Sequence, residues 1–298
     1  MRYNYIGTSD LSASVAGFGC MSLSKAPKQQ AAVLVEAAVQ AGINYFDTAD
    51  LYDKGENEKL IGQLLKPVRN KVIIASKVGN EWKKDGSGWD WNPRKSYILK
   101  AVEGSLKRLQ TDHIDMYQLH GGTLDDPIEE TIEAFELLVQ QGKIRYYGIS
   151  SIRPNVIRKY VSLSNIQSVM MQYSLLDRRP EEAALHLIKE NTISVLARGV
   201  LAQGLLIDKP AKDYLGYTAG EIAGVRKQLL PQETEGYSST GIALQYVLSN
   251  AAVASAVIGF RTVEQLNDVL DGLDNPIPAT IIENLRQWVP AKKYTDHR

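Results

Sequence analysis

The sequence predicts an α/β protein folded as one eight-stranded (β/α) barrel. Three observations indicate this fold: eight short apolar segments recur along the chain, helix-like segments separate them, and no linker-like stretch divides the 298 residues. Strands that alternate with helices indicate βαβ units and a parallel sheet. Such a barrel typically has about 250 residues. We therefore expect residues 1–298 to form a single domain, although the length alone would also fit two smaller domains.

The predicted elements follow one another in a regular order. Residues 1–16 contain the turn signals Gly7-Thr8 and Ser9-Asp10, which predict an N-terminal β-hairpin at the barrel bottom. The predicted strands cover 17–20, 43–46, 72–76, 114–119, 144–149, 166–171, 193–197 and 254–258. The predicted helices cover 28–40, 56–65, 93–109, 127–140, 154–163, 181–189 and 240–248.

Capping signals support several helix starts. Asn92-Pro93 and Asp126-Pro127 each put a capping side chain before a proline at the first helical position. Thr262 and Gln265 have the spacing of a capping box, which predicts a further helix after the last strand.

Two connections are longer than simple turns, at 79–92 and 207–239. Long loops in compact domains are often functional, and both follow a predicted strand, so they should rise from the C-terminal face where barrel enzymes have their sites. Trp82, Trp89 and Trp91 on the first loop would wall an apolar substrate pocket. Alternatively, these side chains form a small core beneath a lid.

Composition excludes several classes of protein. The 34 basic residues balance the 34 acidic ones and are scattered among them, which does not favour binding to nucleic acid. The longest nearly apolar stretch, 250–260, is too short to span a bilayer, and the N-terminus does not resemble a signal peptide. The four histidines and Cys20 lack metal-ligand spacing. With one cysteine and no possible intrachain disulfide, we expect a cytoplasmic protein without a metal or membrane partner.

Ionisable residues follow the ends of three predicted strands. Asp47 follows the second strand, with Tyr52 in the next loop, and Lys77 and His120 follow the third and fourth strands. The carboxyl ends of barrel strands meet at one rim, so these four side chains should lie together. Any one of them alone would more commonly be a cap or a salt-bridge partner.

This set of side chains suits proton donation to an oxygen atom. An ammonium group beside a phenol favours the phenolate and makes the phenol a better proton donor. A buried lysine needs a counter-charge, which Asp47 can provide. His120 can orient a carbonyl oxygen or relay a proton. A hydride would then have to come from another group.

Six segments together resemble the aldo-keto reductase superfamily, in the family's order and from Gly17 to about Leu270. They are Gly42-Ile43-Asn44-Tyr45-Phe46-Asp47-Thr48-Ala49-Asp50-Leu51-Tyr52, Ala75-Ser76-Lys77, Gln118-Leu119-His120, Tyr147-Gly148-Ile149-Ser150-Ser151, Tyr173-Ser174-Leu175-Leu176-Asp177-Arg178 and Gly204-Leu205-Leu206. The resemblance implies that NADPH gives a hydride to a small-molecule aldehyde or ketone. It makes Tyr52 the proton donor, Lys77 its activating lysine, Asp47 the aspartate and His120 the histidine.

The resemblance also implies a nicotinamide site, with three departures from the family. Ser150 and Ser151 match the pair that bonds the amide, although the second position is usually Asn. Met170 stands where the family has a glutamine, and Gln172 on the same strand face is the alternative candidate. Arg198 replaces the usual aromatic residue, and its planar guanidinium can also stack on a ring.

The rest of the implied cofactor site lies near the last two strands. The residues that match the pyrophosphate loop are Gly199, Val200, Leu201, Gln203 and Gly204. Arg261, beside a capped helix, matches the 2′-phosphate position and favours NADP(H) over NAD(H), and Gln265 matches an adenosine contact. Val269 replaces the family's adenine-binding Asn. Gly19, Cys20, Met21 and Gly259 complete the expected set.

Three functions remain open at this point. An active NADPH-dependent carbonyl reductase is favoured. A nicotinamide-binding sensor or regulatory protein on the same fold would keep the four residues but turn over little substrate. An unrelated barrel enzyme, such as a metal-dependent lyase or hydrolase, would need a carboxylate and histidine cluster that the sequence lacks. The sequence predicts neither the substrate nor the oligomeric state.

Overall fold

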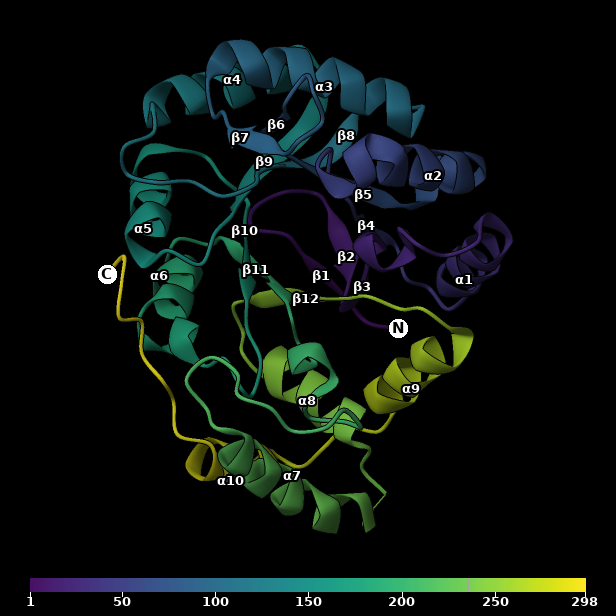
Figure 1. The fold of residues 1–298 in the computed structure, drawn as a ribbon, viewed down its shortest axis with the longest axis vertical. Helices are drawn as coiled ribbons and strands as arrows, with labels where there is room; N and C mark the ends of the chain where they lie inside the picture. The colour runs from purple at the N-terminus through teal and green to yellow at the C-terminus, as the bar shows by residue number, and fades with distance from the viewer. Residues whose placement is uncertain (235) are drawn as a thin grey trace.

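A closed barrel of eight parallel strands forms the centre of the computed structural model, which describes residues 1–234 and 236–298 (Figure 1). The strands, in order around the barrel, are β10 (Ser168–Gln172), β11 (Ser194–Arg198), β12 (Val253–Ile258), β3 (Ala16–Gly19), β4 (Tyr45–Asp47), β5 (Ile73–Val78), β8 (Ile114–Leu119) and β9 (Ile144–Ser150). The fold class and all eight strands predicted from the sequence are confirmed, with shifts of a few residues at their ends.

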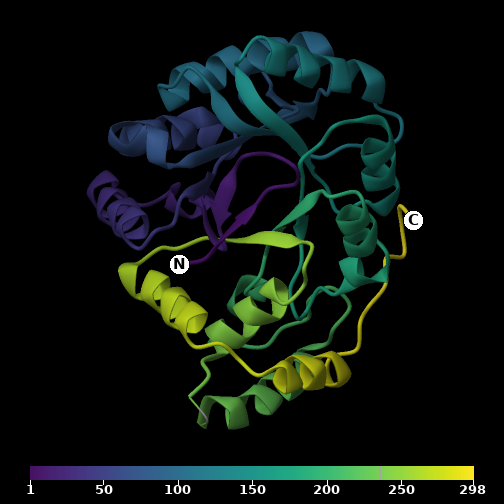
Figure 2. The ribbon, with the colours of Figure 1, turned by 180° about the vertical axis from the view of Figure 1, so that it is seen from behind.

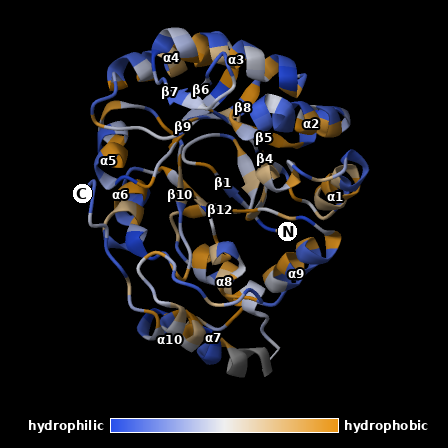
Figure 3. Cartoon of the chain, viewed as in Figure 1, coloured by the Kyte–Doolittle hydropathy of each residue, from blue (hydrophilic) through white to orange (hydrophobic). Residues whose placement is uncertain are grey.

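Helices surround the barrel, as the alternating pattern predicts (Figures 1 and 2). They are α1 (Lys28–Gln40), α2 (Glu56–Leu65), α3 (Lys95–Leu109), α4 (Ile128–Gln140), α5 (Pro154–Leu163), α6 (Ala184–Glu190), α8 (Ser239–Leu248) and α9 (Val263–Asp274). Each carries both polar and apolar residues (Figure 3). Their apolar side chains pack on outward-facing strand residues such as Phe46 and Ile74, which gives the larger of two buried clusters.

The strand residues that alternate with these outward-facing ones point inward and fill the barrel interior. Tyr45, Ile73, Met116 and Leu196 form the smaller buried cluster together with residues of the N-terminal segment. That segment is the predicted hairpin, made of β1 (Tyr3–Tyr5) and β2 (Ser12–Ser14). Its apolar residues Ile6, Leu11 and Ala13 are buried against the strand side chains, so the hairpin plugs the barrel.

The two long connections contain secondary structure that the sequence pattern did not predict. Residues 79–92 contain a small antiparallel hairpin, made of β6 (Asn80–Trp82) and β7 (Trp89–Trp91). Residues 207–239 contain α7 (Ala219–Thr234), which packs near α10 (Ala279–Trp288) at the edge of the molecule (Figure 1). The sequence pattern gave no prediction for α10.

Two predicted caps also differ from the structure. The helix after Asn92 begins at Lys95, and the Asn92 side chain accepts a hydrogen bond from the backbone of Arg94. Asp126 accepts from Thr123 instead of capping α4. The predicted cap at Thr262 is confirmed, because its hydroxyl accepts from the Gln265 backbone N–H. No helix in the described part of the chain is long and apolar enough to cross a membrane.

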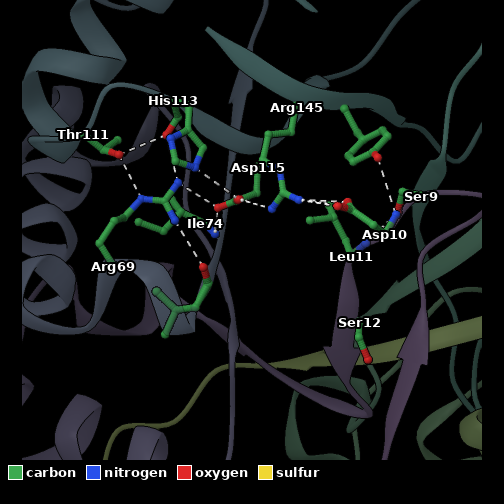
Figure 4. Close-up of polar contacts among 12 residues, drawn as sticks. Ser9, Asp10, Leu11, Ser12, Arg69, Ile74, Thr111, His113, Asp115 and Arg145 are labelled. Atoms are coloured by element: carbon green, nitrogen blue, oxygen red, sulfur yellow. Dashed lines mark hydrogen bonds and ion pairs between the residues drawn. The ribbon is translucent and has the colours of Figure 1, made fainter. Parts of the chain in front are cut away.

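An ionic network lies at the bottom of the barrel, around the buried Asp115 of β8 (Figure 4). The Asp115 carboxylate accepts from the backbone N–H of Ile74 (2.9 Å) and lies 2.8 Å from Arg69 and 3.0 Å from Arg145. Arg145 also pairs with Asp10 of the N-terminal segment at 2.8 Å. The Asp115 carboxylate therefore connects β8 with β5, β9 and the segment before β5, and Arg145 extends the network to the hairpin plug.

We expect Asp115→Asn to lower the free energy of unfolding by about 1.5–3 kcal/mol, because charge-assisted hydrogen bonds to Arg69 and Arg145 are weakened. Urea unfolding with an unchanged m-value would measure this loss. The matched control is Asp10→Asn, which affects only a more exposed pair and should cost less than about 1 kcal/mol. Equal losses in the two variants would contradict a central role for Asp115.

Candidate active site

Four polar side chains converge at the carboxyl ends of three neighbouring strands. Asp47 ends β4, Lys77 is the penultimate residue of β5, and His120 directly follows β8. Lys77 Nζ lies 2.6 Å from Asp47 Oδ2 and 3.3 Å from Tyr52 Oη. The Tyr52 and His120 rings are in edge-to-face contact, with centroids 5.8 Å apart. The structure thus brings the four predicted residues together.

Tyr52 reaches this cluster through a tight turn after β4. Tyr52 begins a short 3₁₀ segment, Tyr52–Gly55, in which Asp53 and Lys54 have φ angles of 48° and 56°. Gly55, with φ 88°, completes a run of three left-handed residues before α2 starts. Left-handed backbone in residues other than glycine carries strain and is often found at functional sites. The turn directs the tyrosine back over the lysine.

One partner of Lys77 was not predicted. The backbone carbonyl of Thr48 accepts a hydrogen bond from Lys77 Nζ at 2.8 Å. The Thr48 hydroxyl in turn donates to Asn57 of α2 at 2.7 Å, and Asn57 donates to the Cys20 carbonyl. A carbonyl acceptor is common to every residue, so the sequence contained no signal for it.

Burial and charge determine the protonation states in this cluster. Burial is the largest single influence and disfavours the Lys77 charge, but Asp47 and Tyr52 together outweigh it and raise the pKa of Lys77, which keeps the ammonium form. Burial raises the pKa of Asp47, and Lys77 opposes that rise. Burial, followed by the charges of Lys77 and Arg198, lowers the pKa of His120 to about 3. The imidazole is therefore neutral at physiological pH.

The cluster has unused hydrogen-bonding capacity. Among the described residues, Asp47 Oδ1 and His120 Nδ1 are buried polar atoms without a hydrogen-bond partner. A neutral imidazole has one N–H donor and one acceptor nitrogen, so His120 can bond an uncharged oxygen. A phenol beside an ammonium group can give up a proton. Together these groups can polarise and protonate a carbonyl oxygen.

The predicted nicotinamide residues occupy the neighbouring strand ends. Ser150 ends β9, and the buried Ser151 follows it. Gln172 ends β10 and is half-buried, and its Oε1 accepts from Arg198 Nη1 at 3.2 Å. Arg198 ends β11 and is exposed. Met170 packs in the interior cluster of the barrel.

The loop after β11 has the backbone of a ligand cradle. Gly199, Ala202, Gln203 and Gly204 all have positive φ angles, of 69°, 46°, 61° and 87°. Val200 is buried, Leu201 is half-buried and Gln203 is exposed. A Cβ on Gly199 would come within 3.1 Å of the Gln172 side chain. Turns of this kind can point backbone N–H groups at an anion, so this loop is a candidate for binding a pyrophosphate.

A second candidate for anion binding lies after β12. Gln265 Oε1 accepts from the Arg261 backbone N–H at 2.9 Å at the capped start of α9. The Arg261 side chain is exposed and, within the described ranges, has no ion-pair partner, so it is free to bind a phosphate. Val269 is buried in the helix face toward the core and is not available to a ligand.

The residues near β3 that were expected to contact the cofactor differ in how accessible their side chains are. Gly19 and Gly259 are adjacent across β3 and β12, since a Cβ on Gly19 would meet the Gly259 nitrogen at 3.5 Å. Met21 is exposed, but the Cys20 side chain is fully buried and donates to the Phe18 carbonyl. Cys20 therefore offers a ligand only its backbone.

The three tryptophans of the β6–β7 hairpin have different environments. Trp89 is exposed, and Trp82 is half-buried beneath the Lys54 ammonium, 5.1 Å from its ring. Trp91 donates to Asp126 at 2.9 Å and packs on Gly79. Trp91 thus supports the hairpin, as in the alternative of a small core, while Trp82 and Trp89 remain candidates for the pocket wall.

Comparisons with known proteins agree with this geometry. The sequence model of the Aldo/keto reductase family matches residues 16–289. An uncharacterized oxidoreductase of Bacillus subtilis, YqkF, is 51% identical over 277 residues, covering 90% of both chains. The holo form of aldo-keto reductase AKR11C1 from Bacillus halodurans is 47% identical, with a TM-score of 0.95 over 100% of this chain and 99% of that one. The apo form of AKR11C1 gives a TM-score of 0.87 at 44% identity and the same coverage.

Proposed function

Because this chain belongs to the aldo/keto reductase family, we propose that it reduces an aldehyde or ketone to the alcohol with NADPH. Family membership makes it an oxidoreductase that uses a pyridine nucleotide on carbonyl compounds. The preference for NADPH, the proton donor and the site residues belong to the proposal. The contact of Tyr52 Oη with Lys77 Nζ at 3.3 Å is the observation that carries it.

In this proposal Tyr52 protonates the carbonyl oxygen. When bound, NADPH supplies the hydride that adds to the carbonyl carbon. As the Tyr52 hydroxyl gives its proton to the oxygen, the Lys77 ammonium stabilises the phenolate left behind. Asp47 compensates the buried charge of Lys77 at 2.6 Å. Solvent returns the proton to Tyr52 after the alcohol leaves.

His120 acts as a neutral hydrogen-bond partner of the same oxygen. Its low pKa, caused mainly by burial, prevents it from adding a second positive charge beside Lys77. A fixed dipole directed at the oxygen orients the carbonyl and stabilises charge that develops there. The edge-to-face contact with Tyr52 keeps the two rings in a defined relation.

The dinucleotide would be held by residues of five strand ends. Ser150, Ser151 and Gln172 are assigned to the nicotinamide amide, with the Arg198 guanidinium against the ring. Eleven further residues are assigned to the rest of the dinucleotide, most of them through backbone groups. They are Gly19, Cys20, Met21, Gly199, Val200, Leu201, Gln203, Gly204, Gly259, Arg261 and Gln265. The positive-φ loop and the free Arg261 side chain support this assignment.

We expect Arg261→Ala to raise the Kd for NADPH by about tenfold or more while changing the Kd for NADH less than about twofold, because only NADPH has the 2′-phosphate and a charge-assisted bond contributes about 1.5–3 kcal/mol. Quenching of tryptophan fluorescence measures both constants. Lys293→Ala, on the exposed C-terminal tail, is the matched loss of one positive charge. An equal loss for both cofactors would refute the 2′-phosphate assignment.

The proposed substrate would bind beside apolar side chains of the upper loops. Three of the exposed large hydrophobic side chains come from the β6–β7 hairpin and from the connections that follow β8 and β9: Trp89, which begins β7, Leu124 and Ile152. We assign to this surface a small carbonyl compound with an apolar substituent. The reaction would take place within a single domain and, since the chain has one buried cysteine, in a reducing cytoplasm.

A substrate panel tests the proposed reaction. Aldehydes, ketones and pyridoxal are each incubated with the protein and NADPH, and loss of NADPH absorbance is followed. Faster turnover of carbonyls with apolar substituents is the expected result. Failure of the whole panel would favour the sensor alternative over the reductase.

A further inference from the structure

We propose that Tyr214 is a positioning residue that controls dinucleotide affinity by holding Gln172 and, through it, the Arg198 guanidinium. This inference rests on the proposed function, which places Arg198 against the nicotinamide. Tyr214 lies on the connection between the cradle loop after β11 and α7. Tyr214 is not among the site residues expected from the sequence and lies within the long connection 207–239.

A chain of two hydrogen bonds connects the three side chains. Gln172 Nε2 donates to Tyr214 Oη at 2.9 Å, and Gln172 Oε1 accepts from Arg198 Nη1 at 3.2 Å. A guanidinium contains only donors, so it can bond only the carbonyl end of the amide. The NH₂ end then needs an acceptor, which Tyr214 provides. The two contacts together fix which way the amide faces.

Arg198 depends on this arrangement. In the described part of the chain, Gln172 Oε1 is the one hydrogen-bond acceptor of its exposed guanidinium, and Arg198 has no salt bridge. A long exposed side chain with one anchor would otherwise sample several rotamers. The orientation of Arg198 therefore follows the orientation of the Gln172 amide. The Arg198 charge acts on the catalytic cluster, since it contributes to the lowered pKa of His120 after burial and Lys77.

Hydrogen bonds hold the turn that carries Tyr214 in place. Its backbone forms two hydrogen bonds with Tyr217, of 2.9 and 3.0 Å, around a turn in which Leu215 and Gly216 have φ angles of 48° and 82°. Two left-handed central residues are typical of a tight type I′ turn. The buried Tyr217 donates to the Pro290 carbonyl of the C-terminal tail at 2.6 Å. The phenol of Tyr214 is thus presented by a supported turn and is not a freely moving loop group.

These contacts connect the position of the loop after β11 with the contact between Arg198 and the nicotinamide ring. The segment that carries Tyr214 continues from the positive-φ loop assigned to the pyrophosphate. When that loop is in place, Tyr214 lies beside Gln172, and Arg198 is held for the nicotinamide. Displacement of the loop would remove the acceptor from the amide and release Arg198. One phenolic oxygen would therefore couple the pyrophosphate and nicotinamide parts of the cofactor site.

A double-mutant cycle on the full chain tests this inference without relying on turnover. The Kd for NADPH and for NADP⁺ is measured by tryptophan fluorescence quenching in the wild type, Tyr214→Phe, Arg198→Ala and the double variant. Tyr214→Phe should raise the Kd for NADPH about three- to tenfold, since a net hydrogen bond contributes about 0.5–1.5 kcal/mol. In the Arg198→Ala background the same substitution should change it less than about twofold, because the side chain that Tyr214 positions is gone.

The controls separate this inference from the function on which it depends. Tyr237→Phe, a half-buried tyrosine between α7 and α8, should leave both constants unchanged. If Tyr214→Phe has the same effect with and without Arg198, the positioning role is wrong and a general loop effect explains the loss. If Tyr214→Phe has no effect while Arg198→Ala does, the inference fails but the Arg198 assignment stands. If Arg198→Ala changes neither constant, both fail, and the proton-donor assignment to Tyr52 is untouched.

Discussion

Tyr52→Phe is expected to lower kcat/KM for an aldehyde by about 10²–10⁴-fold, because general acid catalysis by a positioned side chain contributes about that much. The substitution removes the one hydroxyl that lies 3.3 Å from Lys77 Nζ and leaves the ring against His120. The Kd for NADPH should stay within about twofold, since the proposed cofactor contacts come from other strand ends. Stopped-flow absorbance under single-turnover conditions separates the two quantities.

A matched substitution supports the interpretation of that result. Tyr5 is exposed on the N-terminal hairpin at the opposite end of the barrel, so Tyr5→Phe should retain full activity. A Tyr52→Phe variant that reduces aldehydes at the wild-type rate would rule out Tyr52 as the proton donor. A wild-type protein that binds NADPH tightly and reduces nothing would instead match the sensor alternative.

Lys77→Met is expected to abolish detectable turnover and to lower the free energy of unfolding by about 3–5 kcal/mol, because removing one partner of a buried ion pair leaves the other charge unpaired. Both side chains of the pair are almost fully buried, at 1% and 6% exposure, and their charged atoms are 2.6 Å apart. Urea unfolding measures the loss, and the same samples are assayed for NADPH oxidation.

The pH dependence of Lys77→Met provides its internal check. Lys77 lowers the pKa of Asp47, which burial raises, so its removal moves that pKa higher in the folded protein. A carboxyl group with a raised folded-state pKa binds more protons when folded, and stability then falls as pH rises through that range. The deficit of Lys77→Met should therefore shrink at acidic pH, where Asp47 becomes neutral.

The companion variant Asp47→Asn/Lys77→Met removes both charges and should recover part of the stability at neutral pH without recovering activity. If the single and double variants were equally destabilised at every pH, lost packing rather than an unpaired charge would be the cause. Such a result would leave the catalytic role of Lys77 to be judged from turnover alone.

The catalytic cluster could be predicted from sequence because parallel strands impose a shared edge. Asp47, Lys77 and His120 each follow an apolar run, and alternation with helices makes the runs parallel. Once the strands close into a barrel, residues 73 positions apart in the chain, from 47 to 120, have to meet. The residue types then indicated the chemistry, and the resemblance indicated the reaction.

Other features could not be predicted because they depend on tertiary contacts. Thr48 contributes a backbone carbonyl, which no side-chain pattern reveals. Tyr214 meets Gln172 across 42 positions through a turn whose two left-handed residues include Leu215, a residue with little turn preference. Asp126 was expected to cap a helix, but its carboxylate instead bonds Thr123 and the Trp91 indole. In each case a contact with a residue distant in the sequence determines the structure, and local sequence preferences do not reveal that contact.

The separation between the two ends of the barrel has a consequence for engineering. The Asp115 network and the hairpin plug hold strands together at the bottom, whereas the tryptophan hairpin and the loop of Tyr214 rise at the top. Libraries that randomise the exposed side chains of these upper loops should therefore yield mostly folded variants, because the Asp115 network, the hairpin plug and the buried loop residues are unchanged. New substrate preferences could be selected in this chain without a prior round of stabilising mutations.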